Sequence, residues 1–331
     1  MQTITKTIEP VARLPEGQFI DVSMDYAGRL LLLMLINKTP VEHRPAQKLP
    51  DTEKQTYTYQ VWQTKNEDSY ELSLYTEITV DSEVYYAQRF TNGDILLVFT
   101  QYKYRNKEDC DKSGYIYSVD GQLKKRILLG DGIAQVHITK DDVIWISYSD
   151  QSLLADSGCD NFTNLGLAGL IAWNADGKKV YEFEPSNDLY KIIDCYALNV
   201  TLNMETYAYY FYNDDNYRGE FDLVKIKDKK INNYWHMPVS GSGSFIVSDI
   251  VGDDKAVFDS GYPPHNTLFY LVELQKEHQA QIMKQFAFEY KGENILQRER
   301  SSRCYPRARN DSFLVVKDKY LFVIPFTEFL S

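Results

Sequence analysis

The feature that most constrains this chain is a recurring unit of short extended segments hinged by tight turns. Its clearest copy runs from Gly130 to Phe183. Two short turns and one long polar connection join four apolar or alternating segments there, at 134–138, 143–148, 170–173 and 179–183. This pattern predicts one antiparallel sheet of four strands.

Similar hinges recur along the whole chain. Pairs of extended runs meet at Gly, Asn, Asp or Met turns near positions 28, 93, 141, 204, 253 and 311, which lie 48 to 65 residues apart. A further pair of runs follows each of the first five hinge pairs. Six such units predict an all-β fold, a six-bladed β-propeller of four-stranded antiparallel blades.

Closure of the predicted ring needs the N-terminal segment. The sixth unit offers an inner strand at Arg303–Ala308, a second at Phe313–Lys317 and a third at Tyr320–Ile324, after which the chain ends. We therefore predict that Thr3–Ile8 pairs with Tyr320–Ile324 as the fourth strand, because a propeller leaves few free edges. No linker or helical period marks a second domain, so residues 1–331 are predicted to form a single propeller domain.

Charge and aromatic content restrict the class of partner. The chain carries a net charge of −11, which disfavours nucleic acids and anionic membranes and favours a basic protein. Its 26 Tyr and 16 Phe suit β-strands. The longest apolar run, Leu30–Ile36, is too short to span a bilayer. We expect a monomer that binds a protein partner.

Cysteine usage and the first residues bear on the compartment. Met1–Val11 lacks the apolar centre of a signal peptide. The four cysteines lie far apart without a C-x-x-C pair, which favours free thiols over a disulfide framework: Cys110, Cys159, Cys195 and Cys304. We expect a bacterial, cytoplasmic protein.

The long connections of the predicted blades should gather on one face. In a propeller, the loop between the second and third strands of a blade lies on the same face as the connection into the next blade. The long polar loops are of this kind: 37–55, 101–113, 149–169, 213–220 and 259–266. Their tyrosines, Tyr104, Tyr217 and Tyr262 among them, suit contact with a partner, or else packing of loop on loop.

An acidic group on this rim is a candidate cation site. Asp150, Asp156 and Asp160 fall within eleven residues, and Asp131 lies on the same rim. Carboxylates are ligands for hard cations, but the spacing matches no calcium loop, so a solvated acidic loop is the alternative. No histidine spacing indicates zinc.

An arginine cluster near the C-terminus is unusual in so acidic a chain. It comprises Arg298, Arg300, Arg303, Arg307 and Arg309. On a strand, Arg303, Arg307 and Arg309 would share one face by the period of two. Buried guanidinium groups need partners, so either acids of neighbouring inner strands or an anionic ligand should pair with them. A solvated edge is the third interpretation.

The best-defined unit also resembles a known group of proteins. Gly130-Asp131-Gly132-Ile133, the strand Val143–Tyr148 and the turn Asn174-Ala175-Asp176-Gly177 resemble bacterial six-bladed β-propeller-like proteins without an assigned activity. The resemblance covers about one blade, some fifty residues. It implies the fold and no reaction.

Two classes of function follow. The first is a non-enzymatic binding protein that grips its partner with the loop-rich rim, for example an immunity-type protein that neutralises a basic toxin, without a cofactor. The alternative is a metal-dependent hydrolase similar to the gluconolactonase-like propellers, which hold a divalent cation such as calcium with Glu, Asn and Asp. Glu83, Asn199 and Asp249 lie on or beside predicted inner strands, but they do not match that motif.

Overall fold

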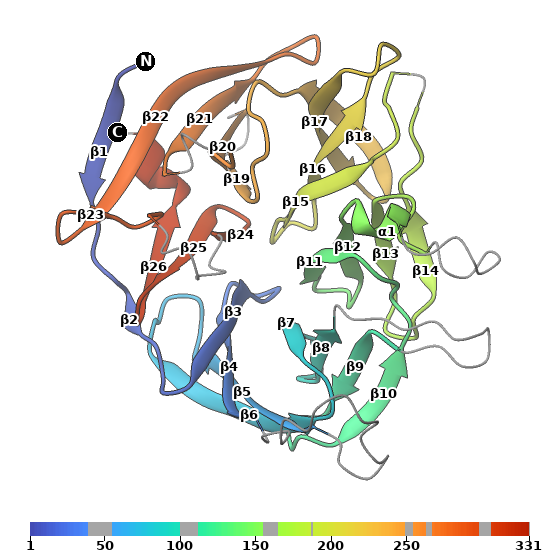
Figure 1. The fold of residues 1–331 in the computed structure, drawn as a ribbon, viewed down its shortest axis with the longest axis vertical. Helices are drawn as coiled ribbons and strands as arrows, with labels where there is room; N and C mark the ends of the chain where they lie inside the picture. Colours follow the sequence, from blue (N-terminus) through green and yellow to red (C-terminus); the bar gives the residue numbers. More distant parts are fainter. Residues whose placement is uncertain are drawn as a thin grey trace, which may run out of the picture.

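The strands of this protein form six sheets arranged as blades around a central axis (Figure 1). The structure, a computed structural model, describes residues 1–38, 55–99, 112–154, 165–186, 188–248, 254–262, 267–297 and 306–330. Antiparallel pairing joins consecutive strands within each blade. The prediction of a six-bladed propeller with four-stranded antiparallel blades is therefore confirmed.

The first four blades follow one another along the chain, each running from its innermost to its outermost strand. Blade 1 contains β3 (Gln18–Met24), β4 (Leu30–Lys38), β5 (Tyr57–Thr64) and β6 (Leu72–Val80). Blade 2 contains β7 (Val84–Arg89), β8 (Ile95–Phe99), β9 (Gly114–Tyr117) and β10 (Leu123–Ile127). Blade 3 contains β11 (Ile133–Ile138), β12 (Ile144–Tyr148), β13 (Leu170–Trp173) and β14 (Lys179–Glu182), with the helical turn α1 (Gln151–Leu154) after β12. Blade 4 contains β15 (Asp194–Val200), β16 (Thr206–Asn213), β17 (Gly219–Lys227) and β18 (Lys230–His236).

The last two blades share the N-terminal segment. Blade 5 contains β19 (Phe245–Val247), β20 (Lys255–Asp259), β21 (Phe269–Leu274) and β22 (Ala280–Tyr290), with the short β23 (Glu293–Asn294) beside β22. Blade 6 contains β24 (Arg307–Arg309), β25 (Ser312–Lys317) and β26 (Tyr320–Pro325), and the 3₁₀ turn η1 (Phe326–Phe329) follows. The outer neighbours of these blades are β1 (Thr3–Thr7) and β2 (Ala12–Arg13).

The N-terminal segment closes the ring, but with a different strand from the predicted one. The outer strand of blade 6 is β2, in which Ala12 pairs with Leu321 and Arg13 with Tyr320. The predicted closing segment, Thr3–Ile8, instead forms β1 and pairs in parallel with β22 of blade 5. The pairing of Thr3–Ile8 with Tyr320–Ile324 was therefore wrong, because β22 is eleven residues long and offers β1 a free edge.

The hydrophobic core is divided into clusters at the seams between neighbouring blades. Strand β4 shows why its apolar run does not alternate with polar residues: Leu31 and Leu33 face blade 2, while Leu30 and Leu32 face blade 6. Both faces of a blade are covered, so both sets of side chains are buried. The seam between blades 6 and 1 joins the two ends of the chain.

The predicted hinges are tight turns between the first two strands of the blades. Glycine at positions 28 and 93 adopts φ of +81° and +91°, a region that other residues rarely adopt. Turns also occur at the predicted positions near 141, 204 and 311, and position 253 lies outside the described residues. In the described part of the chain, no helix is long and apolar enough to cross a membrane.

Candidate functional site

The innermost strands of the blades surround the axis of the propeller. Each blade starts with its inner strand, so all of these strands run from the face of the long connections, the loop face, toward the face of the tight hinges, the hairpin face. Early residues of each inner strand therefore lie nearer the loop face than late ones. Alternate side chains point into the axis because of the two-residue period.

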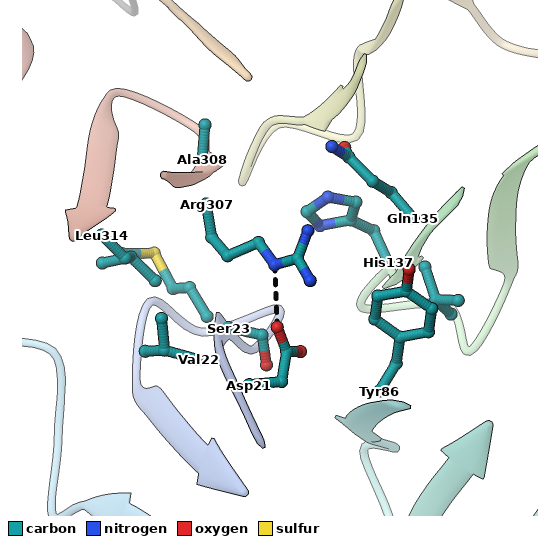
Figure 2. A pocket seen from close by; sticks show the side chains of 11 residues that line it. Asp21, Val22, Ser23, Tyr86, Gln135, His137, Arg307, Ala308 and Leu314 are labelled. Atoms are coloured by element: carbon teal, nitrogen blue, oxygen red, sulfur yellow. Dashed lines mark hydrogen bonds and ion pairs between the residues drawn. The ribbon is translucent and has the colours of Figure 1, made fainter. Parts of the chain in front are cut away.

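A polar cavity lies on the axis (Figure 2). The empty space in it is about 340 Å³, solvent at its opening included. Blades 1, 2, 3 and 6 provide the polar side chains of its wall: Asp21, Ser23, Tyr86, Gln135, His137 and Arg307. We call this space the axial cavity.

Arg307 is the charged group at the centre of the axial cavity. Its Nε donates a hydrogen bond to Asp21 Oδ1 at 2.8 Å, and its guanidinium lies 5.4 Å from the centroid of the Tyr86 ring. Burial by itself lowers the pKa of Arg307, but Asp21 and Tyr86 outweigh this effect, so the guanidinium stays charged. Burial raises the pKa of Asp21, and the charge of Arg307 opposes that rise.

His137 lines the same cavity as a neutral imidazole. Burial first, and then the charges of Arg309 and Arg307, place the pKa of His137 well below its usual value. Its Nδ1 is buried and has no hydrogen-bond partner among the described residues. Buried polar atoms are normally satisfied, so this nitrogen is available to a bound group.

A network of hydrogen bonds, which we call the floor of the axis, spans its hairpin end. Arg309, which is 1% exposed, donates to Met24 O at 2.7 Å and Ile138 O at 2.5 Å, and it also contacts Gln88 Oε1 at 3.3 Å. Asn199 donates from Nδ2 to Phe245 O and Asn310 O, both at 2.9 Å. These contacts link inner strands of all six blades at the hairpin end of the axis.

The loop face of blades 3 and 4 forms a second feature, which we call the acidic face. Its connections bear six carboxylates against the two bases Lys191 and Arg218: Asp131, Asp150, Glu184, Asp188, Asp214 and Asp215. None of the six forms an ion pair with another described residue. On the hairpin side, by contrast, carboxylates pair with lysines, as in Asp94–Lys124 and Asp176–Lys125.

Tyrosines accompany the acidic face. Tyr217 is 88% exposed in the turn between β16 and β17, and Tyr262 of blade 5 is 47% exposed. The Tyr262 ring meets the Tyr196 ring edge-on, with centroids 6.3 Å apart, and their hydroxyl groups are hydrogen-bonded. Tyr262 thus packs on Tyr196 of β15, whereas Tyr217 has no ring contact among the described residues. Contact of these tyrosines with a partner stays a prediction.

Asp194, at the start of β15 beside the acidic face, has a strongly raised pKa. Burial and the nearby charge of Asp150 raise the pKa of Asp194 to about 6. The folded state therefore holds a proton that the unfolded state has lost between about pH 4 and pH 6, and stability falls as the pH rises through this window.

We predict that Asp194→Asn stabilises the protein at pH 8 by about 1 kcal/mol, since solvent screening reduces the full effect of the shift. The gain should vanish near pH 3.5. Urea unfolding at both pH values measures it. Asp176→Asn is the matched control with the opposite sign, because Lys125 lowers the pKa of Asp176. An equal gain from Asp194→Asn at both pH values would contradict the assignment.

The structure locates five of the nine predicted site residues. Arg307 lines the axial cavity, and Asp131, Asp150, Tyr217 and Tyr262 lie on the loop face. Tyr104, Asp156, Asp160 and Arg303 lie outside the described residues. Of the predicted inner strand Arg303–Ala308, positions 303–305 lie outside the described residues, and β24 covers Arg307–Arg309. Within it, Arg307 and Arg309 do share the face toward the axis, and both have internal partners.

Most residues of these features were not singled out as site residues from the sequence. Asp21, Tyr86, His137 and Asp194 are the ones with the clearest roles in the two features. The only sequence signal for the first three is their position on inner strands at the same two-residue period that marks the arginines. Their convergence depends on the packing of separate blades.

The residues considered for a metal site do not come together. Glu83 is exposed and paired with Lys38 at 3.1 Å, whereas Asn199 is fully buried in the floor of the axis. Asp249 lies outside the described residues. Among the residues that are described, no group of three or more His, Cys, Asp or Glu side chains is arranged to hold a metal ion.

Comparisons with known proteins give similarity in structure alone. No family model and no curated protein sequence matches the chain. The β-propeller domain of the Trilobed protease from Pyrococcus furiosus is similar over 93% of this chain and 84% of its own, with 9% identity and a TM-score of 0.41. A glucose dehydrogenase is similar over 93% and 98%, with 10% identity and a TM-score of 0.42. A protein of unknown function from Bacteroides caccae matches over 66% and 81%, with 13% identity and a TM-score of 0.37.

Proposed function

We propose that this chain is a non-enzymatic binding protein that holds a basic protein partner on its loop face. The observation behind the proposal is the set of six carboxylates on the acidic face without an ion pair among described residues. Repulsion within such a set raises the free energy of the unbound protein, and lysine or arginine side chains of a partner would relieve it.

The tyrosines suit the same partner. Tyr217 and Tyr262 offer large, rigid surfaces with few rotatable bonds, as in many protein interfaces. Their ring faces also attract cationic side chains. Carboxylates and exposed aromatic rings together fit a surface rich in lysine and arginine better than a neutral one.

The loop face is also where a rigid propeller can present variable segments. Long connections on a fixed scaffold commonly hold binding residues. An immunity-type protein, which blocks a basic toxin by covering it, is the specific form of this function that we propose. This role needs surface complementarity and no catalytic group.

We predict that a short lysine-rich peptide binds the wild-type protein, and that Asp150→Lys weakens the binding about tenfold at low salt. Most of the loss should appear in the association rate and should shrink as the ionic strength rises. Stopped-flow fluorescence with a labelled peptide measures both quantities.

Asp120→Lys is the matched control, because it makes the same change in net charge on the hairpin side at an exposed residue. It should alter the affinity by less than a factor of about two. Equal weakening by Asp150→Lys and Asp120→Lys would show attraction to net charge only and would refute a defined acidic face.

A further inference from the structure

Arg307 uses only part of its guanidinium within the described residues. Its Nε donates to Asp21 Oδ1 and the Tyr86 hydroxyl is a second hydrogen-bond neighbour, so at most two of its five N–H groups have a partner there. The side chain of Arg307 is 28% exposed and that of Asp21 is 5% exposed. Figure 2 shows the guanidinium between Asp21 and His137, in the axial cavity.

Among the described residues around Arg307 and Arg309, four arginines (Arg29, Arg89, Arg307 and Arg309) accompany two carboxylates, Asp21 and Asp25. Asp21 balances Arg307, but Arg309 is bound by two carbonyls and an amide and has no carboxylate in hydrogen-bond contact. Asp25 is already shared by Arg29 at 2.8 Å and Arg89 at 3.4 Å. A cationic axis in a chain with a net charge of −11 is unexpected. Buried charge without a counter-charge is costly, so an anion on the axis would lower that cost.

His137 supplies a second group for the same ligand. Neutral imidazole can place its proton on Nδ1, and that nitrogen is buried and has no partner within the described chain. The ring of His137 and the guanidinium of Arg307 line the same cavity (Figure 2). Several converging donors without an internal acceptor are suited to the oxygens of an anion.

The size of the space restricts the ligand. The cavity volume is about 20 Å³, measured as the space open to the centre of a water-sized sphere. One water needs ~10–15 Å³ by this measure, so the cavity admits a single small group, such as a carboxylate or a phosphate, and no larger molecule. The fork of an arginine binds two oxygens of such a group at once.

We propose that the axial cavity is a binding site for a small oxyanion, a carboxylate or phosphate group, held by the remaining N–H groups of Arg307 and by His137. The Asp21 contact holds the guanidinium in place and orients these groups. This site is independent of the acidic face, because its wall belongs to blades 1, 2, 3 and 6. The anion is either a free small molecule or the carboxylate end of a peptide.

Thermal melts at constant ionic strength test the site with inorganic phosphate, acetate and a short peptide that has either a free or an amidated C-terminus. A ligand of the folded state raises the melting temperature with concentration, so at least one oxyanion should do so while chloride does not. The probe that raises the melting temperature identifies the source of the anion. A shift with the free-acid peptide but not its amide indicates a peptide terminus, whereas a shift with phosphate indicates a free anion.

Arg307→Lys tests the residue without removing its charge. It should weaken oxyanion binding at least about tenfold, because a lysine lacks the fork. The control is Arg126→Lys, which changes an exposed arginine stacked on Tyr115 at 4.5 Å. In wild-type protein, the ring nitrogen signals of His137 should shift on titration with the bound anion. If no oxyanion acts beyond chloride, or if Arg307→Lys binds as tightly as wild type, the proposal fails.

Discussion

Deletion of residues 1–15 is expected to destabilise the propeller by about 5 kcal/mol, and deletion of residues 1–9 by only about 2 kcal/mol. The shorter deletion removes β1, whose Ile4, together with Ile8, is only partly buried against blades 5 and 6. The longer deletion also removes β2 and exposes the edge of β26. Urea unfolding followed by circular dichroism measures both losses.

Deletion of β2 and its flanking residues is expected to cost more stability because this segment buries Leu14 and forms backbone hydrogen bonds with blade 6. Leu14 is 9% exposed in the seam between blades 6 and 1. The N–H groups of Val11 and Leu14 also donate to the carbonyls of Leu321 and Lys319, each at 2.8 Å. Leu14→Ala in the full chain should cost about 2–4 kcal/mol and serves as the point-mutation control. Equal losses from the two deletions would contradict closure by β2.

The blades were predictable because their information is local. Apolar runs, two-residue alternation and turns such as Asn92-Gly93 fix strands and hinges within some twenty residues of sequence. The number of blades then follows from counting the repeated four-strand units. Leu30–Met34 does not alternate between apolar and polar residues, but it could still be predicted as a strand because both faces of a blade are buried.

The partner of the first strand was not predictable in the same way. Thr3–Ile8 alternates and forms a strand, as expected, but the choice between two blade edges depends on their length and position in space. Pro10 separates this segment from β2, whose two residues are too few for a pattern to reveal. The sequence indicated closure by the N-terminal segment without identifying the strand that makes it.

The candidate site was predictable only for groups that stand out in the sequence. Arg307 belongs to a dense arginine cluster, whereas its partner Asp21 lies 286 positions away and looks like any other acid. Asp194 meets Asp150 because blades 3 and 4 are neighbours. Such pairings arise from the ring and not from a local pattern.

Arg307→Met is expected to destabilise the protein by about 3 kcal/mol at pH 8. Asp21 would then be a buried carboxylate without its cation. An arginine that served only a ligand would give the opposite result, because its removal from the unliganded protein would leave stability unchanged or higher. Thermal and urea unfolding without added oxyanion distinguish the two outcomes. Arg126→Met, at an exposed site, should cost less than about 1 kcal/mol.

The pH dependence of unfolding and a double mutant test whether unpaired Asp21 causes the destabilisation by Arg307→Met. Burial already raises the pKa of Asp21, and without Arg307 nothing opposes that rise, so the folded variant binds a proton that the unfolded chain has lost. The variant is thus most stable at low pH, and its loss relative to wild type should be smaller at pH 5 than at pH 8. Adding Asp21→Asn to Arg307→Met should recover part of the stability at pH 8 and abolish this dependence. A loss that is equal at both pH values, and unchanged in the double variant, would mean that Arg307 stabilises the axis by packing alone.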